Sequence, residues 1–473
     1  MHHHAGLYTD YYELTMSQGY FLSDRMNERA CFDYFFRSNP YQGGFLVFAG
    51  LEDFLEVLEN FSYSPEDLEY LESTGLRKEF IRYMKDFRFT GTIYSMREGE
   101  IAFPTEPLIR VEGNLIETQL IETLLLSFMN FESLIATKAF RVKLVTGKRP
   151  FAEFGLRRAQ GIGGIQASRA AIIGGATSTS NVYAGQRYNV PVSGTQAHSW
   201  IQSFDDELTA FRKYAEFNPD QTILLVDTYN TLQSGVPNAI IVAKELEEKG
   251  HRMLGVRLDS GDLAYLSKKA RKMLDDAGLN YIKIVASNQL NEHLVNSLNE
   301  QQAPIDSFGI GTEMITGKPD AALDGVYKLA ACNGQPRIKI SENIEKITLP
   351  GTKELYRYYD EEGMFYRDGI QLKGESENTS GILYHPSQPL KKTTVKGLKK
   401  ESLLEKVFEN GKMLIPSRSP IEIHSFLEHR ASLLSDEVKR FVNPHLYKVG
   451  ISEGLQTLRD NMLHGIQDKK THL

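Results

Sequence analysis

The sequence is poor in cysteine and carries no excess of positive charge. Its 473 residues include 2 cysteines, Cys31 and Cys332, which lie far apart and without metal-ligand spacing. We therefore expect two buried thiols in a reducing compartment rather than a disulfide framework or a zinc site. The formal net charge of −7 argues against a general nucleic-acid binder, which needs a basic face to neutralise phosphates.

A long uncharged apolar run is also missing. The most apolar stretch, residues 120–142, contains four charged side chains: Glu122, Glu132, Lys138 and Arg141. A transmembrane helix of that length does not tolerate so many charges. With no signal-peptide pattern at the start of the sequence, we expect a cytoplasmic protein with neither a membrane nor a nucleic acid as partner.

The sequence does contain a regular series of short apolar runs, each ending in polar, charged or glycine residues. In chain order they are FAEFGLRR (151–158), VPVSGTQAHS (190–199), TILLVDTYN (222–230), MLGVRLDSGD (253–262), IKIVASN (282–288) and FGIGTE (308–313). Segments with helical periodicity separate these runs. The pattern predicts a (β/α) barrel whose reactive groups gather at the C-terminal ends of the strands.

Composition changes along the chain predict three domains. Residues 5–140 mix helical and strand-like patterns and indicate an N-terminal α+β domain. Residues 141–349 contain the barrel pattern and form the predicted catalytic domain. Residues 350–473 are rich in tyrosine and charge and are predicted to form a C-terminal module that packs with the N-terminal domain.

His198 and Asp227 are the first candidate pair for chemistry. His198 stands just past a predicted strand end, and Asp227 ends the next strand. A carboxylate that bonds one imidazole nitrogen fixes the tautomer and raises the nucleophilicity of the other nitrogen. The pair suits a general base or a phosphate-accepting nucleophile, and spacing alone does not separate these roles. A structural histidine is the alternative.

Three further strand ends carry candidate binding groups. In RLDSGD (257–262), one of Ser260 and Asp262 is expected to cap the following helix, which leaves another carboxylate for sugar hydroxyls or Mg²⁺. The turn GIGT (309–312) offers backbone N–H groups to a phosphate. In FGLRR (154–158), we expect the Phe154 ring to stack on a flat anionic ring and Arg157 to orient that ring. The alternative is that the Phe154 ring packs the barrel and the arginines face solvent.

Taken together, these motifs resemble the nicotinate phosphoribosyltransferase family. The resemblance extends over nearly the whole chain and includes YTDYYELTM (8–16), FDYFFR (32–37), EFGLRRAQG (153–161), SNVYAG (180–185), GTQAHS (194–199), LLVDTYNT (224–231), RLDSGDL (257–263), GIGTEM (309–314) and GVYKLA (325–330). Nicotinamide phosphoribosyltransferase is a more distant relative that shares fewer of these motifs.

The resemblance implies a fold and an activity. The fold is an incomplete α/β barrel of the type II phosphoribosyltransferase kind, beside a domain built largely from the N-terminal part. The activity forms nicotinate mononucleotide and pyrophosphate from nicotinate and phosphoribosyl pyrophosphate, coupled to ATP hydrolysis, in the salvage of NAD. Mg²⁺ is expected to bind through substrate phosphates, and the family places its active sites at a homodimer interface.

The resemblance also implies roles for individual residues. His198 matches a histidine that ATP phosphorylates transiently, Asp227 its orienting acid, and Asp259 the carboxylate that holds the ribose hydroxyls. The residues expected to bind the pyridine are Tyr12 (contributed by the partner subunit), Phe154, Arg157 and Ser180. The residues expected to hold the ribose and its 5′-phosphate are Arg257, Ser287, Asn288, Gly309, Gly311 and Thr312. The residues expected to neutralise the phosphates are Arg37, Lys328 and Lys339.

Two absences refine this prediction. No GxxxxGK[ST] loop occurs in the sequence, so we expect ATP to share the site of the phosphoribosyl donor. The amide-specific relative has an acid close to the position of Ser180, where this sequence has Ser180 and Asn181, and the lack of an acid favours nicotinate over nicotinamide. A catalytically silent nucleotide-binding barrel is the alternative of another class, and the presence of His198, Asp227 and Asp259 argues against it.

Overall fold

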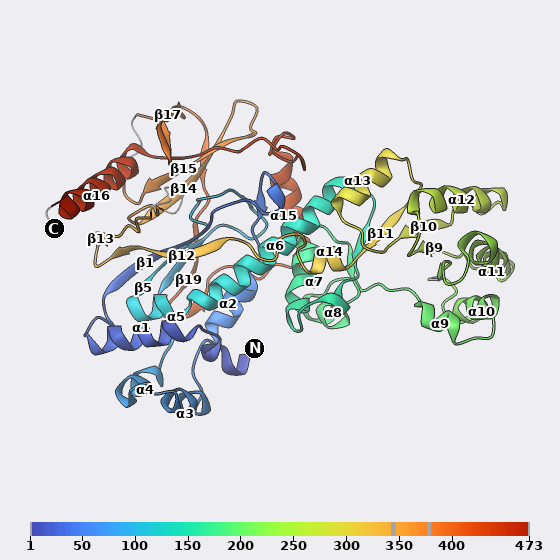
Figure 1. Ribbon diagram of the computed structural model, residues 1–473, viewed down its shortest axis with the longest axis horizontal. Coiled ribbons are helices and arrows are strands. Elements are labelled where there is room, and N and C mark those ends of the chain that lie inside the picture. Colours follow the sequence, from blue (N-terminus) through green and yellow to red (C-terminus); the bar gives the residue numbers. More distant parts are fainter. Residues whose placement is uncertain (1, 342–346, 376–379, 472–473) are drawn as a thin grey trace. The chain divides into compact units, whose positions relative to one another are not determined.

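The computed structural model describes residues 2–341, 347–375 and 380–471 (Figure 1). They are divided between unit 1, with Met1–Leu134, Ala322–Arg418 and Ser425–Leu473, and unit 2, with Ile135–Ala321 and Ser419–His424. Compact units need not coincide with separately folding domains. The three predicted domains, 5–140, 141–349 and 350–473, therefore stay predictions.

Unit 2 contains a sheet of six parallel strands in the order β7-β6-β11-β10-β9-β8. The strands are β6 (Phe151–Glu153), β7 (Ser178–Thr179), β8 (Ile223–Leu225), β9 (Gly255–Leu258), β10 (Lys283–Ala286) and β11 (Ser307–Ile310). The predicted α/β class with a parallel sheet is confirmed. Curvature of this sheet into an incomplete barrel stays a prediction, because the described ladders leave β7 and β8 as edge strands.

Helices connect these strands in the expected alternation (Figure 1). They are η3 (Leu156–Arg158), α7 (Gly163–Ile173), α8 (Val182–Tyr188), α9 (His198–Gln202), α10 (Glu207–Phe217), η4 (Thr231–Gly235), α11 (Val236–Glu248), α12 (Leu263–Asp276), α13 (Glu292–Glu300) and α14 (Thr312–Ile315). Asp262 caps α12 by accepting a hydrogen bond from the Tyr265 N–H at 3.0 Å. The predicted helix cap in RLDSGD is thus Asp262, and Asp259 remains available for other contacts.

One predicted strand of this sheet is wrong. The segment before Gly194 forms an isolated bridge between Val192 and Thr179 rather than a strand, and the neighbour of β6 is the short strand β7. Pro191 has no N–H to donate to a ladder; its carbonyl accepts the Thr179 N–H at 3.0 Å. His198 consequently follows a loop, at the first residue of α9, instead of a strand end.

Unit 1 contains an antiparallel sheet of seven strands in the order β13-β12-β1-β5-β3-β19-β20. The strands are β1 (Arg29–Phe36), β3 (Thr92–Ser95), β5 (Ile109–Asn114), β12 (Gly325–Cys332), β13 (Gln335–Pro336), β19 (Glu405–Glu409) and β20 (Lys412–Met413). The N-terminal strands β1, β5 and β3 therefore lie together in the middle of the sheet, and strands from later parts of the chain flank them on both sides. Both cysteines lie on paired strands of this sheet and are free and buried, as predicted.

A second sheet of unit 1 has the order β17-β16-β21-β15-β14-β18. Its strands are β14 (Lys353–Tyr359), β15 (Phe365–Leu372), β16 (Ile382–His385), β17 (Gln388–Thr394), β18 (Lys400–Ser402) and β21 (Val449–Ile451), and the small strands β2 (Leu46–Val47) and β4 (Ile101–Ala102) pair separately. The fully buried Arg357 bonds Glu100 at 2.6 Å and Asp368 at 2.6 Å. These two ion pairs tie the C-terminal strands to N-terminal residues, and the two carboxylates compensate the buried charge of Arg357.

The remaining helices belong to unit 1 or cross the division between the units. They are η1 (His2–Leu7), α1 (Tyr11–Leu22), η2 (Pro40–Gln42), α2 (Leu51–Glu59), α3 (Pro65–Ser73), α4 (Lys78–Met84), α5 (Leu115–Leu120), α6 (Glu122–Thr146), α15 (Pro420–Ser432) and α16 (Glu453–Thr471). The stretch Leu115–Thr146 is long and apolar enough to cross a membrane, but 72% of its most apolar window is buried inside the protein. Such burial is typical of a core helix.

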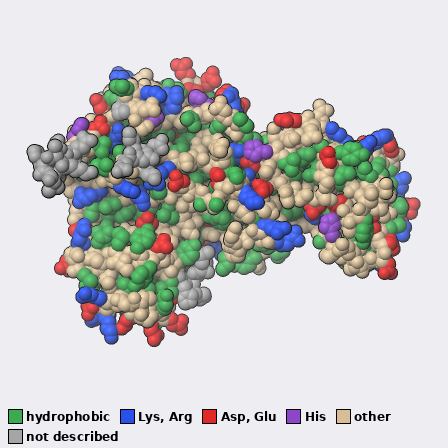
Figure 2. Space-filling model, viewed as in Figure 1, with side chains coloured by type: hydrophobic (Ala, Val, Ile, Leu, Met, Phe, Trp, Pro, Cys, Tyr) green, Lys and Arg blue, Asp and Glu red, His purple; other side chains and the backbone are tan. Residues whose placement is uncertain are grey.

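On the face shown in Figure 2, acidic and basic side chains are interspersed over both units.

Candidate functional site

The C-terminal ends of the neighbouring strands β9 and β10 bring three predicted site residues into direct contact. Arg257 donates from Nε to the Ser287 hydroxyl at 2.8 Å and lies with Nη2 3.0 Å from Asp259 Oδ1. The Ser287 hydroxyl in turn donates to Asp259 Oδ1. Each side chain contacts the other two, so the Asp259 carboxylate is held through Oδ1 while Oδ2 faces away from this cluster.

His198 lies next to the free oxygen of Asp259. Its Nε2 is 4.0 Å from Asp259 Oδ2, and its Nδ1 is 3.1 Å from the Thr228 hydroxyl. The imidazole is 42% exposed, which leaves it open to a ligand. The structure therefore places His198 between a hydroxyl on one ring nitrogen and a carboxylate near the other.

Asp227 bonds to the β9 turn rather than to the imidazole. Its Oδ2 accepts hydrogen bonds from the Asp259 N–H at 2.9 Å and from the Ser260 hydroxyl at 2.5 Å. Its Oδ1 is buried and has no hydrogen-bond partner among the described residues. The expected hydrogen bond from His198 is replaced by the one to Thr228, and the orienting role of Asp227 stays a prediction.

Phe154 lies against Gly309 of β11 and Gly311 of the turn that follows this strand. A Cβ atom added at Gly309 would lie 2.5 Å from Cδ2 of the Phe154 ring, and one at Gly311 would lie 3.0 Å from the Phe154 carbonyl oxygen. The guanidinium of Arg257 is 6.0 Å from the ring centroid. Glycine at 309 is thus what allows the half-buried ring to occupy this place between the turn and the arginine.

Four predicted residues of unit 2 lie around these contacts with fewer bonds of their own. Ser180 is half-buried after β7, and its N–H donates to the Glu153 carbonyl at 2.9 Å. Arg157 is exposed in η3, and Asn288 is exposed with a φ of 84°. Thr312 is the first residue of the short helix α14. Their roles stay predictions, although each follows a strand of the parallel sheet.

The other predicted residues belong to unit 1. Tyr12 is 47% exposed on α1, and its partial burial beside Glu122 raises the pKa of the phenol well above its ordinary value. Arg37 lies 3.8 Å from Asp324, and Lys328 donates to the Tyr327 carbonyl at 2.8 Å. Lys339 is exposed. The roles of these four residues stay predictions.

Sequence reasoning missed the contacts of four residues that organise unit 2, and it considered one of them, Ser260, only as a helix cap. Thr228 bonds His198, Ser260 bonds Asp227, Thr195 accepts from Arg257 Nη1 at 2.7 Å, and Glu153 accepts from three segments. For Thr228, Ser260 and Glu153 the available signal was a hydroxyl or carboxylate directly beside a predicted site residue, and Thr195 has no such neighbour. It is a weak signal, because threonine and serine at strand ends are common without function.

The oxygen atoms present suit a magnesium ion held mainly by substrate. No cluster of three or more His, Cys, Asp or Glu side chains able to hold a metal occurs among the described residues. Asp227 nevertheless offers a carboxylate oxygen without a partner, and Mg²⁺ prefers few protein oxygens together with phosphates and water. The residues therefore fit an ion that arrives with a phosphate ligand.

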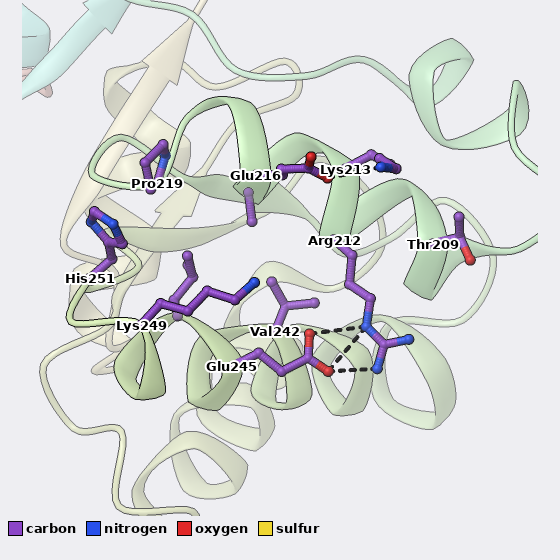
Figure 3. A pocket seen from close by; sticks show the side chains of 11 residues that line it. Thr209, Arg212, Lys213, Glu216, Pro219, Val242, Glu245, Lys249 and His251 are labelled. Atoms are coloured by element: carbon purple, nitrogen blue, oxygen red, sulfur yellow. Dashed lines mark hydrogen bonds and ion pairs between the residues drawn. The ribbon is translucent and has the colours of Figure 1, made fainter.

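A cavity of about 400 Å³ lies elsewhere in unit 2, against α10 and α11 (Figure 3). Among the residues that line it, Arg212 of α10 donates to Glu245 of α11, with a shortest distance of 2.5 Å. Lys213, Lys249 and His251 also line it. None of the predicted site residues lines this cavity, so the strand ends of the parallel sheet remain the candidate site.

Comparisons with known proteins identify the same family that the sequence motifs resemble. The profile of the nicotinate phosphoribosyltransferase (NAPRTase) N-terminal domain matches residues 7–130, and that of the C-terminal domain matches residues 352–459. Nicotinate phosphoribosyltransferase of Bacillus subtilis is 44% identical over 98% of this chain and 96% of its own length. That of Caenorhabditis elegans is 38% identical over 95% and 92%. The crystal structure of human nicotinic acid phosphoribosyltransferase has a TM-score of 0.86 and 33% identity over 96% of this chain and 99% of that one.

Proposed function

Since the chain belongs to the nicotinate phosphoribosyltransferase family, we propose that it forms nicotinate mononucleotide and pyrophosphate from nicotinate and phosphoribosyl pyrophosphate. The reaction is coupled to ATP hydrolysis through a phosphohistidine at His198 and serves NAD salvage in the cytoplasm. The enzyme works as a homodimer with shared active sites. The observation that carries the proposal is the Asp259 carboxylate, fixed by Arg257 and Ser287 with one oxygen directed toward His198.

The fixed carboxylate suits the chemistry of the sugar. Breaking the anomeric C–O bond leaves an oxocarbenium-like ribose and transfers an electron pair to the departing pyrophosphate. Asp259 binds the ribose hydroxyls and stabilises the developing positive charge, because a preorganised carboxylate needs no rearrangement during the reaction. Arg257 and Ser287 keep it in that orientation. The ring nitrogen of nicotinate then forms the new N–C bond with its own lone pair, so no general base is required.

The pyridine ring is held at the other end of the site. Phe154 stacks on the ring, and Arg157 pairs with the nicotinate carboxylate through its guanidinium. Tyr12 of the partner subunit supplies the second aromatic face. Ser180 and Asn181 present no charge to the carboxylate, and this favours nicotinate over nicotinamide.

The phosphates are neutralised by side chains and by the ion they bring with them. Ser287, Asn288, Gly309, Gly311 and Thr312 hold the 5′-phosphate, largely through hydroxyl and backbone N–H groups. Arg37, Lys328 and Lys339 neutralise the pyrophosphate. When bound, Mg²⁺ supplies further charge stabilisation to the leaving group, and Asp227 is the residue whose free oxygen would hold it or one of its waters.

His198 has a separate task from the sugar chemistry. Its nucleophilic nitrogen attacks the γ-phosphorus of ATP, forms a P–N bond and releases ADP as the P–O bond breaks. Water later cleaves the P–N bond and returns the imidazole and inorganic phosphate. The phosphorylated imidazole beside Asp259 favours the state that binds phosphoribosyl pyrophosphate and Mg²⁺, and hydrolysis then drives the balance toward product.

One assay tests the whole proposal. Nicotinate mononucleotide is measured from phosphoribosyl pyrophosphate and Mg²⁺, with nicotinate or nicotinamide, each with and without ATP. We expect product from nicotinate, an increase with ATP, and release of ADP. In His198→Ala we expect the increase with ATP to vanish; ATP stimulation at the wild-type level in that variant would reject the phosphohistidine. Product from nicotinamide would reject the specificity assigned to Ser180.

A further inference from the structure

Glu153 is a fully buried carboxylate at the C-terminal end of β6, next to the residues expected to hold the pyridine. Its Oε1 accepts the N–H of Gly155, and its Oε2 accepts the hydroxyl of Thr179 at 2.6 Å. The hydroxyl of Ser168 lies 3.0 Å from Oε2. Among the described residues the carboxylate has no ion-pair partner, so neutral donors alone compensate its burial.

The donors come from three different segments of unit 2. Gly155 belongs to the turn after β6, Ser168 to α7 and Thr179 to β7. The Glu153 carbonyl also accepts the N–H of Ser180 at 2.9 Å. One residue thus connects the turn that carries Phe154 and Arg157 with the strand end that carries Ser180.

The network continues on the β7 side. The N–H of Asn181 donates to the Thr179 hydroxyl at 3.0 Å, and the Asn181 amide donates to the Ser168 hydroxyl at 3.2 Å. All of these side chains are at least nine-tenths buried. The Gly164 carbonyl also takes part, since it lies 2.8 Å from the Ser168 hydroxyl and 3.3 Å from the Asn181 amide. A buried network of this kind fixes a single arrangement, because loss of one member leaves others unpaired.

Glu153 does not itself belong to the surface expected to touch the ring. Successive side chains of a strand point to opposite faces of the sheet. Glu153 contacts Ser168 of α7, whereas Phe154 lies against Gly309 and near Arg257. An acid so close to Ser180 can therefore coexist with a nicotinate carboxylate, because it is enclosed and fully engaged by donors.

We propose that Glu153 is a positioning residue that sets the spacing between Phe154 and Ser180 and thereby the affinity for the pyridine substrate. The inference rests on the proposed function, which places nicotinate between those two residues. On this proposal, the Glu153–Thr179 hydrogen bond affects the binding of nicotinate. It does not affect the binding of the phosphoribosyl donor, because the residues expected to hold the ribose and the 5′-phosphate lie on or after β9, β10 and β11.

Thr179→Val is the variant that tests this proposal, because valine has nearly the shape of threonine and lacks the hydroxyl. We expect the Kd of nicotinate by titration calorimetry and its KM to rise about tenfold, the effect of leaving a buried acceptor without its donor. The KM of phosphoribosyl pyrophosphate should stay within about twofold. Thr179→Ser, which keeps the hydroxyl, should restore nicotinate affinity.

Thr177→Val is the matched control. Its hydroxyl donates to the Phe151 carbonyl at 3.0 Å. Thr177 lies two residues before Thr179, and Phe151 lies two residues before Glu153, so this hydrogen bond does not involve the Glu153 carboxylate. We expect both substrate constants to remain at the wild-type level, and thermal unfolding shows whether each variant is folded. If Thr179→Val does not fold, Glu153→Gln replaces it; glutamine keeps one acceptor for Gly155, and an increase of about threefold in the nicotinate Kd alone is expected.

Two results would overturn the proposal. One is an unchanged nicotinate Kd in folded Thr179→Val. The other is an equal change in the constants of both substrates, which indicates general destabilisation. Wild-type protein that makes no nicotinate mononucleotide would instead reject the proposed function, so the two failures are distinguished by the wild-type assay.

Discussion

Asp227 holds the backbone of Asp259: its Oδ2 accepts the Asp259 N–H at 2.9 Å and also the hydroxyl of Ser260. One carboxylate thus fixes the position from which another carboxylate projects. This relationship connects the ends of β8 and β9, and it makes the conformation of the RLDSGD turn depend on residue 227.

The first prediction compares two substitutions at this position. Asp227→Asn keeps an oxygen that can accept both hydrogen bonds, whereas Asp227→Ala removes both acceptors. We expect kcat/KM for phosphoribosyl pyrophosphate to fall about a hundredfold in the alanine variant, which corresponds to roughly 3 kcal/mol, and less than tenfold in the asparagine variant. Steady-state kinetics measures both. Equal losses would show that the charge of Asp227, rather than its hold on the turn, is what matters.

The second prediction concerns the hydroxyl that contacts His198. Thr228→Val removes the group 3.1 Å from Nδ1, so the imidazole loses the contact that fixes its orientation and tautomer. We expect the rate of ATP hydrolysis to fall about tenfold, with Thr228→Ser near the wild-type rate. Synthesis without ATP should change little, and a parallel loss in that reaction would show that Thr228 acts on the sugar chemistry instead.

The third prediction concerns the glycine beneath Phe154. Gly309→Ala adds a methyl group 2.5 Å from the ring, so the ring must shift, at a cost of about 1–3 kcal/mol. We expect a higher KM for nicotinate and a lower melting temperature. Gly194→Ala is the control, because a Cβ atom at Gly194 meets nothing within 4 Å and should leave both quantities unchanged. Normal nicotinate binding by Gly309→Ala would show that the position of the Phe154 ring does not affect the binding of nicotinate.

The fourth prediction is a pH dependence of stability. Burial of Glu13 raises the pKa of its carboxyl from 4.5 to about 7, although hydrogen bonds from Thr123 and Thr9 oppose the shift. The folded state then binds a proton more tightly than the unfolded state. The contribution of this group is fully present below pH about 4.5 and is lost as pH rises through about 7. The loss is on the order of 3 kcal/mol.

Glu13→Gln checks this origin. Glutamine is neutral at every pH, so the variant should lack the decrease of melting temperature between pH 5 and pH 8 that we expect of the wild type. The comparison is made by thermal unfolding at fixed ionic strength. Parallel curves for the two proteins would assign the decrease to other groups.

Much of the candidate site was predictable because chemistry follows strand ends. Asp259 and Ser287 each stand directly after an apolar run, and parallel strands bring such ends together. The strand expected before Gly194 was wrong because Pro191 interrupts the ladder. The prediction followed the regular series of apolar runs and did not take this proline into account. β7 was missed since two residues give no periodicity to detect.

The contacts of Thr228 and Glu153 were harder to predict. Threonine at a strand end suits the strand itself, and a glutamate after an apolar run suggests exposure. Their roles depend on which side chains of other elements lie nearby, and the sequence alone does not give that. The pairing of β1 with β12, about three hundred residues away, is a non-local contact of the same kind.

That pairing also orders events during synthesis. The strands of unit 2 are contiguous in the chain, from β6 to β11, so its parallel sheet is complete once residue 310 has left the ribosome. Unit 1 begins earlier but must wait: β1 gains β12, and β3 gains β19, only after the later segments emerge. The first part of the chain to be made is thus among the last to acquire its full set of neighbours, so the edges of its apolar strands stay unpaired until the later strands have been made.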